Sequence, residues 1–150
     1  MSVITSTGTE FAVVAAVPAT ASEAAYEALA WDVVGEVTDL PEYGVDVTVV
    51  NHEPLATGIT EKLKGFKNYG SLTVGLGRDV LDAGQSVLQE GADGATEFTE
   101  HSFRTTFSDG SVHYYMGKIF SYTTNPGSAN SVVASSVKIE INSKVLEVAA

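Results

Sequence analysis

The stretch SLTVGLGRDVLDAGQ, residues 71–85, changes its periodicity near its centre. Residues 71–77 alternate apolar with small or polar side chains, which is typical of a β-strand with one buried face. We expect three side chains of this strand to point inward: Leu72, Val74 and Leu76. Residues 79–91 then follow a helical pattern, with Asp79 as the N-cap and Gly91 at the C-terminal end. The apolar stripe of this helix, which should pack on a sheet, is expected to contain Val80, Leu81, Val87 and Leu88.

Alternation of apolar and polar residues recurs along the chain, so strands dominate the prediction. Further strands are expected at residues 31–38, 45–49, 59–64 and 137–141. In the first two, the inward residues are expected to be Trp31, Val33, Val37, Val45, Val47 and Val49. The opposite side would then be one polar, acidic surface on neighbouring strands, formed by Asp32, Glu36, Thr38, Asp46 and Thr48. The expected fold is mainly β: a β-sandwich or partial barrel flanked by one α-helix. Residues 19–29 suit either a short helical turn or a loop.

A β-hairpin is predicted around Asp109-Gly110, because this pair suits a two-residue type I′ turn. The turn fixes a register in which three pairs share one apolar face: Phe107 with Val112, Thr105 with Tyr114, and Phe103 with Met116. The outer face would then expose Tyr115 and Ile119. Apolar side chains exposed on strands indicate either a partner that covers them or scattered surface hydrophobic residues, which are common.

The acidic residues are concentrated in the first third of the chain. Residues 31–46 hold five carboxylates and no Lys or Arg, and all nine acidic residues from Glu10 to Glu53 precede the first base, Lys62. The net charge of −11 argues against an ordinary nucleic-acid-binding surface, which needs Lys and Arg to neutralise phosphates.

The length of 150 residues and the 44% hydrophobic content predict one compact domain spanning residues 1–150. Residues 1–10 are interpreted as a flexible polar arm and residues 50–70 as a long excursion that contains a strand and the turn KGFKNYG. The absence of cysteine fits a reducing compartment. We find no signal peptide or membrane span in the N-terminal apolar run.

No pattern in the chain predicts an enzyme, a metal site or a cofactor. The Gly75-Leu76-Gly77 turn lacks the third glycine and the parallel unit of a dinucleotide loop. The three histidines lie on separate elements without zinc-ligand spacing: His52, His101 and His113. Paired acids, such as Asp79 with Asp82 or Glu36 with Asp46, more often cap helices or face solvent than act on a sugar.

Three stretches together resemble the major tail tube proteins of long-tailed, siphovirus-type bacteriophages. They are YEALAWDVVGEVTDLPEYG at 26–44, SLTVGLGRDVLDAGQ at 71–85 and FSYTTNPGSANSVVASSVKIEI at 120–141. The resemblance implies a structural subunit whose hexameric rings stack into a tube, with inner sheets joined in a continuous β-barrel. It also implies a virion protein, assembled in the host cytoplasm, that meets tape-measure, tail-terminator and tail-tip proteins. DNA would pass through the lumen without specific binding, and no membrane would be involved.

The resemblance implies an acidic channel and stacked rings, and the charge pattern of this sequence suggests which residues contribute to each. The acidic face is expected to line the channel and repel DNA, with Asp32, Glu36 and Asp46 as candidates. The basic cluster in the 50–70 excursion is expected to contact the adjacent ring, with Lys62, Lys64 and Lys67 as candidates; a solvated turn is the alternative. Rival hypotheses are a tail-end ring protein, a secretion-tube protein, or a carbohydrate-binding β-sandwich that stacks sugars on Trp31, Tyr43 or Tyr69.

Overall fold

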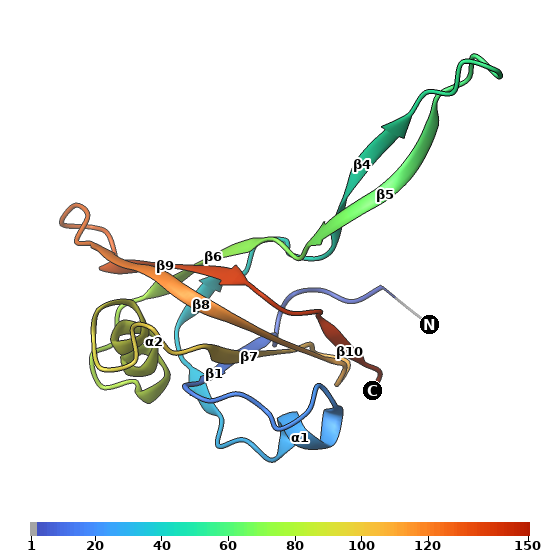
Figure 1. Cartoon of the computed structure of the whole chain (residues 1–150). Coiled ribbons are helices and arrows are strands. Elements are labelled where there is room, and N and C mark those ends of the chain that lie inside the picture. The colour runs from blue at the N-terminus through green and yellow to red at the C-terminus, as the bar shows by residue number, and fades with distance from the viewer. Residues whose placement is uncertain (1–2) are drawn as a thin grey trace.

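The computed structural model describes residues 3–150 and confirms the mainly β prediction (Figure 1). It contains ten strands and two helices: β1 Glu10–Val14, α1 Glu23–Glu27, β2 Asp32–Val34, β3 Val37–Asp39, β4 Asp46–His52, β5 Glu61–Asn68, β6 Ser71–Gly77, α2 Ala83–Asp93, β7 His101–Thr106, β8 Val112–Asn125, β9 Ala134–Ile141 and β10 Leu146–Val148.

Eight of the strands form one antiparallel sheet in the order β2-β1-β7-β8-β9-β6-β3, with β10 paired to β8. The two strands at the ends of this path, β2 and β3, are separated by only Gly35 and Glu36. A sheet whose end strands are joined by two residues must curl until those ends approach each other. The single sheet is therefore a partial barrel within one chain, while β4 and β5 form a separate two-stranded sheet.

The core lies between the curled sheet and α2. Strand β6 provides its three predicted inward residues, and β9 provides the next row: Leu72, Val74, Leu76, Val137, Ile139 and Ile141. Leu88 of α2 is fully buried in the same cluster. Burial of a large apolar side chain stabilises the folded state by about 1.5–3 kcal/mol, so this cluster is the main source of stability.

Strand β1 was not predicted, although it lies inside the sheet between β2 and β7. Its sequence EFAVV is apolar on both faces, and Phe11, Ala12 and Val13 are all buried. A short continuous apolar run carries no alternation, so period-two counting misses it. Glu10 belongs to β1, and the prediction of an arm over residues 1–10 was wrong at that residue. Met1 and Ser2 lie outside the described residues.

The hairpin between β7 and β8 exists, but its predicted register was wrong by one residue. The loop holds three residues rather than two, because Phe107 N–H donates to Ser111 O at 2.9 Å and Gly110 takes the left-handed φ of 91°. Such loops form a type I turn followed by a glycine bulge. Phe103 consequently faces Tyr115, and both Tyr115 and Ile119 are buried rather than exposed.

Helix α2 begins later than predicted. Asp82, not Asp79, is the N-cap, and its carboxylate accepts a hydrogen bond from Gln85 N–H at 2.9 Å. Val80 and Leu81 precede the helix and are exposed, so their assignment to the buried stripe was wrong. Gly91, predicted at the C-terminal end, is buried within the helix, which continues to Asp93.

The turn between β2 and β3 is fixed by the N-terminal end of α2. Glu36 has a φ of 60°, the only positive φ of a non-glycine residue in the described part of the chain. Gly35 N–H donates to Asp82 Oδ2 at 3.1 Å, and the buried Gln85 amide donates to Gly35 O at 3.0 Å and Gly77 O at 2.9 Å. These hydrogen bonds offset the cost, about 1–2 kcal/mol, of a left-handed glutamate.

Candidate assembly surface

The two-stranded sheet β4-β5 projects from the body as a long arm, Asp46–Asn68 (Figure 1). Its strands pair only with each other, and none of its residues belongs to the core cluster. Its large apolar side chains are nevertheless numerous and exposed: Val49, Val50, Leu55, Ile59, Leu63 and Phe66. An isolated hairpin is marginally stable in water, and exposed apolar patches mark interaction surfaces. The arm therefore has the properties of a contact element.

The sequence prediction for this region was partly wrong. Strand β5 runs through Glu61–Asn68, so most of KGFKNYG is strand rather than turn. The predicted strand at 45–49 is longer and reaches His52. A register shift between Val47 and Val49 interrupts the pairing of β4 with β5. Such a bulge bends a hairpin locally and changes which side chains share a face.

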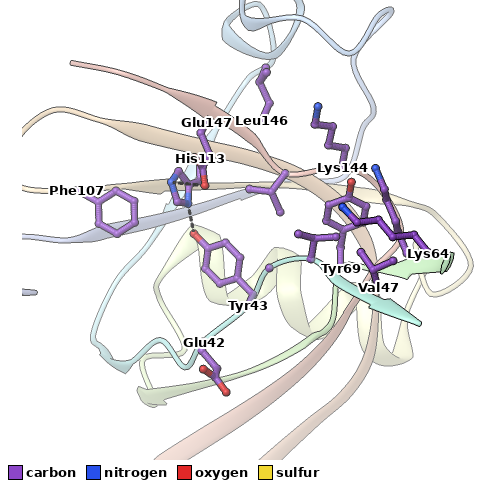
Figure 2. A pocket seen from close by; sticks show the side chains of 14 residues that line it. Glu42, Tyr43, Val47, Lys64, Tyr69, Phe107, His113, Lys144, Leu146 and Glu147 are labelled. Carbon is purple, nitrogen blue, oxygen red and sulfur yellow. Dashed lines mark hydrogen bonds and ion pairs between the residues drawn. The ribbon is translucent and has the colours of Figure 1, made fainter. Parts of the chain in front are cut away.

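A groove of about 760 Å³ lies at the base of the arm (Figure 2). One wall comes from the segment leading into the arm and from the arm itself, the other from β10 and the residues before it. The lining combines apolar side chains with three lysines, Lys64, Lys67 and Lys144, and two carboxylates, Glu42 and Glu147. None of the three lysines makes an ion pair with a carboxylate of residues 3–150. The groove therefore holds three lysines without an ion pair in the described chain, an excess of one positive charge over the two carboxylates, among apolar side chains.

His113 connects the base of the arm to β10. Its Nδ1 lies 2.8 Å from the Tyr43 hydroxyl, and its Nε2 lies 3.6 Å from Glu147 Oε1 (Figure 2). Burial lowers the pKa of His113, while Glu147 acts in the opposite direction. Burial also raises the pKa of Tyr43, so its hydroxyl stays protonated at neutral pH. This contact holds the segment that leads into the arm against the sheet.

The structure separates the three lysines predicted for inter-ring contacts. Lys64 and Lys67 line the groove, whereas Lys62 pairs in register with Asn51, farther along the arm. Lys144 was missed, because it is distant in sequence and reaches the groove only through the pairing of β10 with β8. Whether any of them contacts another ring stays a prediction.

The three predicted channel carboxylates do not share one face of neighbouring strands. Asp32 is half-buried on β2, opposite Val13. Glu36 is exposed in the left-handed turn, and Asp46 is exposed at the start of the arm. The predicted facing of β2 was also inverted, because Val34 is buried and Val33 is not. The channel role stays a prediction, without the shared face that motivated it.

The aromatic residues of the carbohydrate hypothesis lie in two places. Trp31 donates a hydrogen bond to Tyr26 O at 2.8 Å and lies under the Arg104 guanidinium, 5.2 Å from its ring centroid. Tyr43 and Tyr69 both line the groove, where the Tyr43 ring packs against Tyr115. Trp31 and Tyr43 are thus engaged within the domain, and the three rings do not form one open platform.

In residues 3–150, no group of three or more His, Asp or Glu side chains is arranged to hold a metal ion. The buried histidine, His101, donates from Nδ1–H to Thr99 O at 2.9 Å, while Nε2 has no hydrogen-bond partner in the described residues. Neither helix of the described chain has the length and apolar character that crossing a membrane requires.

One buried and one half-buried histidine make the free energy of unfolding depend on pH. Burial lowers the pKa of both His101 and His113 below the ordinary value of 6.5. The unfolded chain therefore binds more protons than the folded chain in this range, and the free energy of unfolding should fall as pH drops below 6.5. Each histidine contributes at most about 1.4 kcal/mol per pH unit. Thermal unfolding between pH 5 and 7.5 should show a shallower pH dependence for His101→Phe than for the unchanged protein; identical slopes would exclude a contribution from His101.

Comparison with solved structures finds the same fold in components of tail-like particles. A chain of the six-fold symmetrised anti-feeding prophage (AFP) baseplate aligns with 99% of this chain and 97% of its own length, at a TM-score of 0.65 and 9% identity. A chain in the tail of an empty GTA particle with C6 symmetry aligns with 83% of this chain and 90% of its own length, at a TM-score of 0.62 and 15% identity. A chain of the AFP tube-terminating cap aligns with 93% of this chain and 88% of its own length, at a TM-score of 0.60 and 14% identity. At these identities the likeness concerns the fold alone.

No protein-family model matches the sequence, and no curated protein matches it.

Proposed function

We propose that this protein is a structural subunit that assembles into stacked hexameric rings and so forms a tail tube. The observation that carries the proposal is the arm, which exposes a series of apolar side chains outside the core of a domain with a tail-particle fold. A monomer gains nothing from exposing these residues, whereas a second copy could bury them. Two of the similar folds belong to particles described with six-fold symmetry, which supports the hexameric ring.

The finer assignment is to the tail tube of a siphovirus-type bacteriophage. Its support is the sequence resemblance of the three stretches described above, within residues 26–141. In this role the protein would reside in the virion tail, meet tape-measure, tail-terminator and tail-tip proteins, and enclose the path of DNA. Its function would be structural rather than enzymatic.

Within the tube, we assign the channel wall to the acidic first third of the chain, with Asp32, Glu36 and Asp46 as contributors. The support is the charge distribution, since a negative lumen repels phosphates and lets DNA pass. We assign contacts between rings to the arm, including Lys62, Lys64 and Lys67. Their support is the exposure of the arm and the absence of ion pairs at the three lysines in residues 3–150.

A ring at the end of a tube is the second candidate function. The AFP baseplate and the AFP tube-terminating cap both contain chains with this fold. A terminal ring would form hexamers that do not continue to stack, whereas a tube subunit would polymerise. The two functions therefore differ in the length of the assembly.

Electron microscopy of the purified chain at rising concentration tests the proposal. Tubes support the tail-tube function, isolated rings support the terminal-ring function, and a monomer at all concentrations contradicts both. A reconstruction of the tube would also locate the side chains, and a lumen without Asp32, Glu36 and Asp46 would contradict their assignment.

A further inference from the structure

The basic groove at the base of the arm lacks a partner within the described chain. Lys64 and Lys67 come from β5 and Lys144 from the segment before β10, so two distant parts of the chain build one positive cluster. Glu42 and Glu147 also line the groove, and Glu147 lies against His113, so the three lysines leave an excess of positive charge that attracts an anionic group. The lining also contains Val47 and Leu146, so the groove fits a segment that is both acidic and apolar.

The same chain presents such a segment at the other end of the body. Residues 79–100 contain six carboxylates and no Lys or Arg. After α2, the acidic loop, residues 93–100, carries Phe98, whose side chain is 86% exposed. The loop is ordered by two turns, in which Glu97 N–H donates to Gly94 O at 3.2 Å and Thr99 N–H donates to Thr96 O at 3.0 Å. A large aromatic side chain is thus held out in solvent between carboxylates.

We infer that the acidic loop of one copy binds the basic groove of a neighbouring copy. Phe98 would pack on the apolar lining residues, and Asp93 and Glu97 would approach the lysines. The inference rests on the proposed assembly and names the surface that meets the base of the arm. If the arm of one copy extends over a neighbouring copy, the body of the neighbour lies against the base of that arm. The groove lies at this base.

The position of the two surfaces makes the contact head-to-tail. Helix α2 lies at one end of the sheet and the arm emerges from the other (Figure 1). One copy therefore cannot fill its own groove with its own loop. A contact of this kind uses the groove of one copy and the loop of the next, so the copies at the two ends keep one free groove and one free loop. Such a heterologous contact can propagate an assembly.

Charge reversal in matched pairs tests the contact. Lys64→Glu with Lys67→Glu should raise the protein concentration required for assembly at least about tenfold, because like charges then oppose each other across the interface. Asp93→Lys with Glu97→Lys should have a similar effect. The fourfold variant, which exchanges the signs, should assemble within about threefold of the unchanged protein. Glu23→Lys with Glu27→Lys on α1 changes the net charge as much as the loop reversal and should leave assembly unaffected.

Disulfide trapping provides a second readout, because the chain has no cysteine of its own. Lys67→Cys and Phe98→Cys, purified separately and mixed under oxidising conditions, should give a covalent dimer on a non-reducing gel. Lys67→Cys mixed with Glu23→Cys should give much less of it.

The outcomes separate this inference from the proposed function. If the unchanged protein forms neither rings nor tubes, the function and the inference fail together. If it assembles but the fourfold variant shows no recovery, or the Lys67→Cys and Phe98→Cys pair gives no more dimer than the control, only the inference is overturned. Recovery together with specific trapping supports it.

Discussion

Removal of residues 50–63, with Val49 and Lys64 joined through an Asn-Gly turn, is expected to leave the domain folded and to abolish its assembly. These two residues pair in the arm, and a two-residue turn of this type closes an antiparallel pair. The deletion removes four exposed apolar side chains: Val50, Leu55, Ile59 and Leu63. Each one buried against a neighbour would contribute about 1.5–3 kcal/mol, which is roughly tenfold to a hundredfold in an association constant.

Circular dichroism and thermal unfolding check the fold of the shortened protein, and sedimentation velocity checks its assembly. A matched control keeps the full arm but replaces Leu55 and Ile59 with Ser. Intermediate assembly of the control would show that apolar contacts, rather than arm length, drive the process. Tubes formed by the shortened protein at the usual concentration would contradict a role for the outer arm.

The substitution Gly84→Ala is expected to destabilise the domain by at least about 2–3 kcal/mol, which lowers Tm by roughly 4–12 °C in a chain of this size. A Cβ at this position would lie 2.5 Å from Val33 O and 2.7 Å from Val34 Cα. Both are backbone atoms, and the hydrogen bonds of Asp82 and Gln85 to Gly35 hold them there. The helix cannot retreat without breaking this network.

The usual effect of Gly→Ala within a helix is the opposite, a stabilisation of about 0.5–1 kcal/mol. A rise in Tm for Gly84→Ala would therefore show that α2 can shift away from β2. Gln89→Ala, on the exposed side of the same helix, is the control and should change stability by no more than about 0.5 kcal/mol.

The strands that sequence predicted well are those with one buried and one exposed face. Residues 71–77 and 137–141 alternate strictly, and their inward residues are buried as expected. Strand β1 lies inside the sheet with both faces covered, so its sequence shows no alternation. The apolar stripe of helix α2 was predicted incorrectly for a related reason. The helix approaches β2 so closely that Gly84 and Gln85 occupy its buried face in place of large apolar residues.

The register of the β7-β8 hairpin could not be decided from Asp109-Gly110. The pair suits a two-residue turn, and it equally suits a three-residue loop in which glycine alone is left-handed. The loop is stabilised by Asp109, whose carboxylate accepts hydrogen bonds from Ser111 N–H at 2.9 Å and Oγ–H at 2.6 Å. These bonds hold the pKa of Asp109 below its usual value. A local side-chain contact therefore set the alignment of the long hairpin.

The candidate site was only half predictable. Sequence located the basic cluster on the 50–70 excursion, since Lys62, Lys64 and Lys67 are close in the chain. It could not associate Lys144 with them, because that proximity depends on β10 pairing with β8. The prediction that three carboxylates share one acidic face was wrong for the same reason. Asp32, Glu36 and Asp46 are near in sequence, but the β2-β3 turn sends the chain from one end of the sheet path to the other.

That turn has a consequence for how the chain folds. Strands β2 and β3 are neighbours in sequence, yet β2 pairs with β1 and β3 pairs with β6. Strand β1 in turn pairs with β7, and the hydrogen bond between Glu10 and Arg104 joins residues 94 positions apart. Pairings of such long sequence separation form slowly. Until they form, β2 and β3 present unpaired backbone edges that can bind other chains. The yield of assembly-competent protein should therefore be limited by the rate of sheet closure, and slow synthesis at low temperature should raise it without any change in the stability of the finished domain.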